Sequence, residues 1–294
     1  MILVAGGTGL LGSLVVTRLS DRGERVRVLT RDPGRARHLP GGVETVTGDV
    51  REANAVVAAM DGCDRVVSAV HGFAGPGRPS PAAIDREGNH NLITAAVGAG
   101  VARFVLVSAL GAAPDHPMSL HRMKFAAEQE LWASTIPGVI VRSAPFLETW
   151  LGVIGAKIAG GGPALVLGRG RNPINFASAR DVAAFVDRAL RDDQLVGETI
   201  SVGGPENLSF NEIAARLVAR GGGSGRTKHV PTAVLGAAAV LARPVRPVFA
   251  RQARAAVVMN TIEMSFDAMP TRLRFPDIAL TAIADVVADL PVSR

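Results

Sequence analysis

Residues 1–12 of the chain read MILVAGGTGLLG, an apolar run that leads into a glycine-rich turn. Gly6, Gly9 and Gly12 have the spacing of a dinucleotide-binding turn, where glycine allows a tight corner, close approach of a pyrophosphate and packing of helix on strand. Residues 10–19 are typical of a helix whose N-terminal N–H groups favour phosphates, and residues 25–30 are a predicted second strand that completes one βαβ unit. We therefore assign cofactor binding to a set of residues in this turn: Gly6, Thr8, Gly9, Leu10, Leu11 and Gly12.

The residues after the second predicted strand bear on the choice between NAD and NADP. An acidic residue about 20 positions beyond the glycines would bind the ribose hydroxyls of NAD. Here Arg31 and Arg35 follow instead, and their guanidinium groups suit a 2′-phosphate. This pattern favours NADP(H). The alternatives are a solvated basic loop, or Asp32 reaching a ribose.

Length and composition are those of an enzyme-sized chain. Its 294 residues, 48% of them hydrophobic, form one large domain or one and a half. The single Cys63 excludes an internal disulfide. No leader precedes the first apolar run, and no apolar run approaches the roughly 20 residues that cross a bilayer. We therefore expect a soluble, cytoplasmic protein.

The formal net charge of +6 raises the question of a nucleic-acid partner. The arginines are spread along the chain, aromatic residues amount to 4%, and tyrosine is absent, which leaves little for base stacking. We expect no nucleic-acid binding, and an anionic dinucleotide accounts for part of the positive charge.

Apolar, strand-like runs alternate with helical segments along the first two thirds of the chain. The further predicted strands are residues 43–48, 65–70, 103–108 and 138–142, and the further helices are residues 53–60, 84–99, 124–133 and 181–190. Such alternation predicts an α/β fold with a doubly wound parallel sheet, the Rossmann arrangement. We place an NADP-binding domain at residues 1–150, with a returning segment near 175–203, and a smaller, discontinuous, mainly substrate-binding region at 151–294.

Further motifs follow the later strands. They are GDV at 48–50, DREGN at 85–89, FVLVS at 104–108 with Gly111, KFAAE at 124–128, IVRSAP at 140–145, RDVA at 180–183 and GGPE at 203–206. In combination they resemble the atypical, NmrA-like branch of the short-chain dehydrogenase/reductase superfamily. The resemblance implies that Asp49 binds the adenine amino group and that Val50 lies by the ring. It further implies that Ala69, Val70 and His71 line the cofactor and that the backbone at Pro145 lies beside the nicotinamide.

The chain departs from that superfamily at the catalytic pair. Many members use a Tyr-x-x-x-Lys pair with tyrosine as proton donor, but here Leu120 stands four residues before Lys124 and the chain contains no tyrosine. Lys124 is then the candidate for ribose binding and acid/base work, against the alternative of a solvated helix lysine. His116 and His121, expected on the preceding loop, titrate near neutrality, and His121 is our candidate proton donor, unless it is only an exposed loop residue. Ser108 either binds cofactor or substrate, or caps its loop.

The remainder of the chain is predicted to form the substrate wall. Phe146 and Trp150 follow Pro145 and are placed to cover a substrate, with core packing as the alternative, and Met264 is a candidate lining residue. Residues 230–264 are apolar and dotted with arginine, which suits a helix over the pocket, a dimer interface or a membrane contact. The histidines and the lone cysteine show no metal-ligand spacing, so we predict no metal site.

Two functions fit these patterns. The first is an NADPH-dependent reductase of an apolar conjugated carbonyl, enone or quinone that lacks the usual tyrosine and relies on Lys124. The second is a non-catalytic NADP(H)-binding sensor or regulatory or assembly protein, which the missing tyrosine would explain. The expected partner is a small apolar substrate, and the expected state is a monomer or homodimer.

Overall fold

The computed structural model describes residues 1–73, 80–221 and 225–289, which form two compact units. Unit 1 comprises Met1–Ser143 and Ala179–Val202, and unit 2 comprises Ala144–Ser178 and Gly203–Arg294. The division falls after Ser143, whereas the sequence analysis placed it at 150, so Pro145, Phe146 and Trp150 belong to unit 2.

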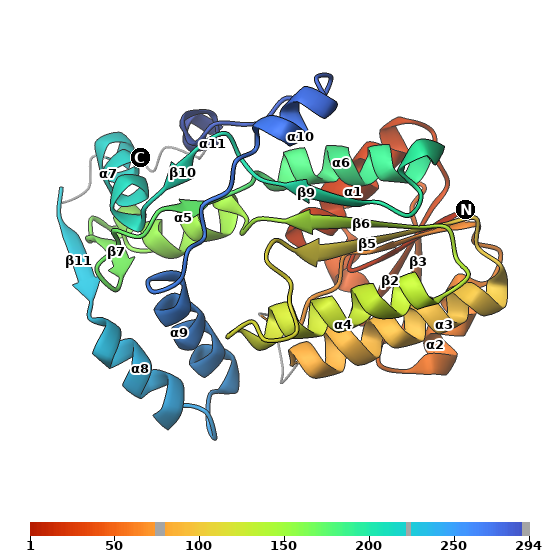
Figure 1. The fold of residues 1–294 in the computed structure, drawn as a ribbon, viewed down its shortest axis with the longest axis horizontal. Helices are drawn as coiled ribbons and strands as arrows, with labels where there is room; N and C mark the ends of the chain where they lie inside the picture. Colours follow the sequence, from red (N-terminus) through yellow and green to blue (C-terminus); the bar gives the residue numbers. More distant parts are fainter. Residues whose placement is uncertain (74–79, 222–224, 290–294) are drawn as a thin grey trace. The chain divides into compact units, whose positions relative to one another are not determined.

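Unit 1 is built on a seven-stranded parallel sheet (Figure 1). In spatial order its strands are β3 (Glu44–Thr47), β2 (Val26–Thr30), β1 (Ile2–Ala5), β4 (Arg65–Ser68), β5 (Arg103–Ala109), β6 (Gly138–Ser143) and β9 (Thr199–Val202). The central strand β1 is buried throughout, as expected when helices cover both faces of a parallel sheet. This topology confirms the predicted doubly wound Rossmann fold. The strand order reverses between β1 and β4, the point at which such sheets bind ligands.

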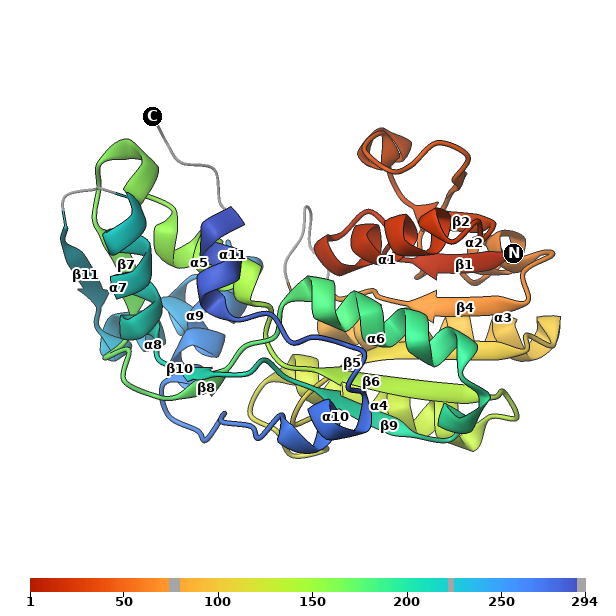
Figure 2. The ribbon, with the colours of Figure 1, turned by 90° about the horizontal axis from the view of Figure 1, so that it is seen from above.

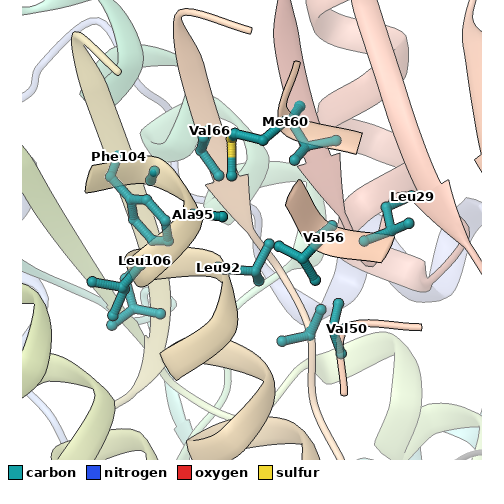
Figure 3. Packing of buried hydrophobic residues seen from close by; sticks show 14 of the residues in the cluster. Leu29, Val50, Val56, Met60, Val66, Leu92, Ala95, Phe104 and Leu106 are labelled. Carbon is teal, nitrogen blue, oxygen red and sulfur yellow. The ribbon is translucent and has the colours of Figure 1, made fainter. Parts of the chain in front are cut away.

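Helices cover both faces of this sheet, as the two views in Figures 1 and 2 show. On one face lie α1 (Leu10–Asp21) and α6 (Ala179–Arg191), and on the other lie α2 (Ala53–Met60), α3 (Asn89–Ala99) and α4 (Ser119–Ala133). Figure 3 shows the core beneath the second group, where Phe104 and Leu106 of β5 face Leu92 of α3 and Val56 of α2. All four side chains are fully buried.

Two predicted helices differ from the observed ones. The segment predicted at 84–99 begins as a π-helical stretch, Ala82–Gly88, before α3. The helix predicted at 124–133 starts earlier, at Ser119. Pro117 limits its extension toward the N-terminus, because the residue before a proline is disfavoured in a helix. His121 is therefore a buried helix residue rather than a loop residue, and Lys124 lies within α4 rather than at its start.

Unit 2 contains shorter elements around its own core. They are α5 (Leu147–Gly155), β7 (Ala164–Leu167), β8 (Ile174–Asn175), β10 (Asn207–Leu208), α7 (Phe210–Gly221), β11 (Thr227–Val230), α8 (Thr232–Leu241), α9 (Pro247–Met259), α10 (Met269–Arg274) and α11 (Ile283–Asp289). Strand β7 pairs with β11 in parallel, and β8 pairs with β10 in antiparallel fashion. Side chains of α5, α7 and α11, among them Leu151, Ile213 and Val286, form the centre of this core.

Candidate dinucleotide site

The glycine turn between β1 and α1 has two glycines that the fold itself requires. Gly6 has φ +85°, and a Cβ there would lie 2.6 Å from the carbonyl oxygen of Ala69. A Cβ on Gly12 would lie 2.1 Å from the carbonyl oxygen of Gly6. Neither position tolerates a side chain, because the turn packs directly on the chain that follows β4 and on itself.

Gly9 differs from these two glycines. A Cβ there would meet only the Gly6 carbonyl oxygen, at 3.3 Å, and its φ of −87° suits any residue. Gly9 is also the N-cap of α1, where no side chain caps the helix. The fold thus places little demand on Gly9, whereas a phosphate at the uncapped helix end does need a bare backbone. This arrangement fits a dinucleotide.

The remaining turn residues contribute in different ways. Leu11 is buried, so only its backbone is available to a ligand, while the Leu10 side chain is 44% exposed. Thr8 is half-buried. The three therefore fit the predicted cofactor site chiefly through their backbone.

Arg31 and Arg35 both lie on the surface just after β2. Asp32, between them, caps the short 3-10 turn Pro33–Ala36 by accepting a hydrogen bond from the Gly34 N–H at 2.9 Å. One oxygen of Asp32 is therefore already engaged, which weakens the alternative of a ribose contact. Two exposed guanidinium groups remain for a phosphate.

Asp49, after β3, is held by Arg51. The guanidinium of Arg51 donates to both carboxylate oxygens, at 3.0 and 2.6 Å, and the Arg51 backbone N–H donates to Oδ1. These hydrogen bonds, more than the charge of nearby Arg31, hold the pKa of Asp49 below its usual range. Asp49 is thus an ionised, buried acceptor, and its role toward adenine stays a prediction.

The segment after β4 forms the wall beside the glycine turn. Ala69 continues the β1–β4 ladder through its N–H to the carbonyl of Ala5 at 2.9 Å, and Val70 is buried in the core. His71 is exposed. Val50, predicted beside the adenine ring, is 9% exposed and belongs to the core shown in Figure 3.

Lys124 is the centre of a buried polar cluster. Its ammonium donates to the carbonyl oxygens of Val70 at 2.7 Å and Val107 at 2.9 Å, and it lies 3.1 Å from Oδ1 of Asp85. Lys124 is 4% exposed and Asp85 is fully buried. The alternative of a solvated helix lysine is therefore wrong. The ammonium instead ties the carboxyl ends of β4 and β5 to α4.

Asp85 is a functional candidate that the sequence analysis missed as a site residue, although it noted the motif at 85–89. The π-helical stretch Ala82–Gly88 brings the Asp85 carboxylate to Lys124, and its other oxygen accepts from the Gly72 N–H at 2.8 Å. The side-chain amide of Asn89 donates a hydrogen bond of 2.7 Å to the backbone carbonyl of Asp85. Such π-helical segments occur frequently at functional sites.

Two further polar groups lie buried near the end of β5 and in α4. Oγ of Ser108 and Nδ1 of His121 have no hydrogen-bond partner among the described residues. His121 stacks on His116 with ring centroids 3.9 Å apart. Burial, and then His116, lower the pKa of His121 to about 3, so that its imidazole is neutral near pH 7. A neutral histidine with that pKa is a hydrogen-bonding group, not an efficient proton donor.

The predicted substrate residues lie in unit 2. Trp150 packs on Phe210, with centroids 4.9 Å apart, and on Phe176, and it borders the unit 2 core. Phe146 is half-buried at the start of α5, and Met264 adjoins the same core. Pro145 accepts a backbone hydrogen bond from Ala177 at 3.1 Å. Trp150 therefore packs within unit 2, as the core-packing alternative predicted. The contacts of all these residues with substrate or nicotinamide stay predictions.

In residues 1–73, 80–221 and 225–289, no three His, Cys, Asp or Glu side chains are grouped as a metal ion would need. Over those ranges, too, every helix falls short of the length and hydropathy that crossing a bilayer requires.

The unit 1 geometry can be compared with known proteins. A family model described as NAD(P)H-binding matches residues 6–193. An NAD(P)H azoreductase of Xenophilus azovorans is 35% identical over 224 residues, which cover 76% of this chain and 74% of the relative. The photosystem II assembly factor Ycf39 of Synechocystis sp. is 30% identical over 235 residues, covering 80% and 72%.

The chain belongs to the NAD(P)H-binding family. Membership confirms the predicted cofactor class and agrees with the resemblance to atypical short-chain dehydrogenase/reductases. It also confirms, at the level of the family, the prediction of an NAD(P)H-dependent oxidoreductase. The 2′-phosphate contact at Arg31 and Arg35 stays a prediction.

Solved structures with the same fold include two reductases. An Escherichia coli NADPH-dependent quinone oxidoreductase complexed with NADPH has a TM-score of 0.78 at 22% identity, covering 98% of this chain and 99% of that one. The Citrobacter sp. triphenylmethane reductase complexed with NADP(H) has a TM-score of 0.79 at 20% identity, with the same coverage. At these identities the likeness establishes the fold alone.

Proposed function

We propose that this protein is an NADPH-dependent reductase of apolar conjugated carbonyl compounds, enones or quinones, and that quinones are the favoured class. The proposal is supported by the 35% identity to an NAD(P)H azoreductase and by the fit of the glycine turn to a dinucleotide. NADPH, when bound, supplies a hydride.

The observation that carries the choice of quinones is that, among the described residues, the Lys124 cluster offers no free general acid that is protonated near pH 7. The chain has no tyrosine, the pKa of His121 is about 3, and the Lys124 ammonium already meets two carbonyls and a carboxylate. Adding a hydride to a simple ketone creates a localised alkoxide that needs such an acid. A quinone that gains a hydride becomes a hydroquinone anion, whose charge is delocalised and which takes its proton from water.

In this proposal Lys124 is a positioning residue. It holds the Val70 and Val107 carbonyls in place and adds a positive charge beside the cofactor ribose. The unpartnered Ser108 hydroxyl is the group we assign to a hydrogen bond with cofactor or substrate. Arg31 and Arg35 select NADPH over NADH through the 2′-phosphate.

The test is the rate of NADPH oxidation by the purified full chain with a naphthoquinone and, separately, with an unconjugated ketone of similar size. We expect turnover with the quinone and at least 100-fold lower kcat/KM with the ketone. Comparable rates with both would overturn the choice of quinones. Oxidation of neither, despite calorimetric binding of NADPH, would favour the second function.

That second function is a non-catalytic NADP(H)-dependent regulator or assembly protein, and the 30% identity to an assembly factor favours it. It predicts a protein partner whose affinity changes with the cofactor. Pull-downs with and without NADPH test this, because capture that ignores NADPH counts against it. Under either function we propose a cytoplasmic monomer or homodimer, which light scattering of the purified chain checks for oligomeric state.

A further inference from the structure

The hairpin of α8 and α9 in unit 2 exposes an apolar tip. Val240 is 71%, Leu241 77%, Val245 77% and Phe249 49% exposed. Helix α8 reads TAVLGAAAVL, yet Leu235 is its one residue classed as buried. A helix that is apolar on every side is normally covered, and a cluster of large exposed apolar side chains marks an interaction surface. The hairpin tip, residues 240–249, is therefore a candidate docking surface.

The charged residues along the segment that contains this tip are of one sign. Residues 213–262 contain no Asp or Glu and eight basic residues: Arg216, Arg220, Arg226, Lys228, Arg243, Arg246, Arg251 and Arg254. Arg243 and Arg246 are exposed and lie between the apolar residues of the tip. Apolar side chains interleaved with arginine are typical of segments that rest on anionic lipid headgroups.

Other occupants fit this pattern less well. A second copy docking tip to tip would bring the same arginines together, and like charges in contact oppose association. Helix α8 is too short to span a bilayer, because its ten residues rise only about 15 Å and the hydrocarbon core is about 30 Å thick. The remaining arrangement is a tip that inserts its apolar residues among headgroups.

We propose that the hairpin tip docks this protein peripherally onto an anionic lipid surface, with Val240, Leu241, Val245 and Phe249 inserted and Arg243 and Arg246 at the phosphates. The contact is monotopic and reversible, so it is sensitive to salt. It does not depend on the reductase activity proposed above.

The test is co-sedimentation of the full chain with vesicles of phosphatidylcholine alone and of phosphatidylcholine with 30% phosphatidylglycerol. We expect binding to the anionic vesicles that falls in 0.5 M NaCl, and little binding to the neutral ones. Arg243→Gln with Arg246→Gln should weaken binding roughly 30-fold, since each arginine near an anionic surface contributes about 1 kcal/mol. Leu241→Ser with Val245→Ser should weaken it at least about tenfold.

Two matched control variants distinguish an effect of the tip from the loss of any exposed apolar side chain or any exposed arginine. Leu273→Ser removes an apolar side chain that is 73% exposed on α10, and Arg25→Gln removes an exposed arginine of unit 1. Both controls should bind vesicles like the unaltered chain, and all variants should bind NADPH normally. The proposal is overturned by absence of binding to anionic vesicles, by tip variants that bind as well as the controls, or by a dimer that only the tip substitutions dissociate.

Discussion

Lys124 and Asp85 form a buried pair of opposite charge in the site. Both side chains are buried, and the lysine also binds the backbone at the ends of two neighbouring strands. A buried ion pair is costly to break because the partner left behind is an uncompensated charge. Loss of activity in a Lys124 variant is therefore ambiguous unless Asp85 is neutralised as well.

Lys124→Met should destabilise the chain by about 3–5 kcal/mol, whereas Lys124→Met combined with Asp85→Asn should recover much of that loss. Urea unfolding measures both effects. If Lys124 positions the cofactor, the double variant should still have at least tenfold lower kcat/KM with a quinone, while Lys157→Met, at an exposed lysine of unit 2, should not. A stable double variant with unchanged kcat/KM would leave Lys124 with a structural role only.

In the glycine turn, Gly12 is required for folding, whereas Gly9 is assigned to cofactor binding. Gly12→Ala should destabilise the chain by at least about 1–3 kcal/mol, because its Cβ would lie 2.1 Å from a carbonyl oxygen. Gly9→Ala should cost less than about 1 kcal/mol but weaken NADPH binding at least tenfold, since the methyl group would occupy the backbone surface to which we assign the phosphates. Calorimetric titration and thermal unfolding of both variants provide the comparison, and normal affinity in Gly9→Ala would contradict the assigned phosphate position.

Helices α1 and α6 are joined by a charged cluster on their face of the sheet. Asp187 of α6 is 1% exposed and forms ion pairs with Arg18, Arg22 and Arg191. Burial would raise the pKa of Asp187, but hydrogen bonds from Arg191 and Arg18 outweigh it and keep the pKa below its usual value. The returning segment Ala179–Val202 is thereby held to the first helix of unit 1.

Asp187→Asn should destabilise the chain by roughly 1–3 kcal/mol at pH 7, a discounted value because the three arginines are partly exposed. The folded-state pKa of Asp187 is depressed, so its contribution is complete above the unfolded value of about 3.9 and is lost as pH falls through the folded pKa. The difference between the unaltered chain and the variant should therefore shrink below about pH 4. Urea unfolding between pH 3 and 7 checks this, and a difference that is constant over that range would contradict it.

Two compact units with separate cores make up the molecule, and unit 1 contains the glycine turn, Asp49 and Lys124. Ligand that binds only the folded state stabilises it by mass action. Cofactor binding should therefore be visible as increased stability of the full chain, without any enzymatic assay.

NADPH at 100 times its Kd should stabilise the chain by about 2.7 kcal/mol and raise Tm by roughly 4–5 °C. NADH at the same concentration should raise Tm less, because it lacks the 2′-phosphate. Arg31→Ala should remove most of that difference, and Arg25→Ala, an exposed arginine elsewhere in unit 1, should preserve it. Equal shifts with NADPH and NADH in the unaltered chain would refute the selectivity assigned to Arg31.

From the sequence alone we could predict six of the seven strands of the sheet, the glycine turn and the cofactor class; β9 (Thr199–Val202) was not predicted as a strand. These follow from local patterns: apolar runs of strand length, glycine spacing and short motifs have the same meaning wherever the chain places them. The early start of α4 and the π-helical stretch at Ala82–Gly88 were missed, because local patterns specify the bounds and the hydrogen-bond type of a helix poorly.

Burial and pairing were decided by the tertiary structure. Lys124 could be singled out by its motif, but its partnership with Asp85 joins residues on different elements, and no local pattern connects them. The same holds for His121. Histidine as a residue type titrates near neutral pH, but the burial of His121 and its contact with His116 lower its pKa to about 3. A side chain's charge state depends on the solvent and partners that folding assigns to it, and those are set by the packing of the whole unit.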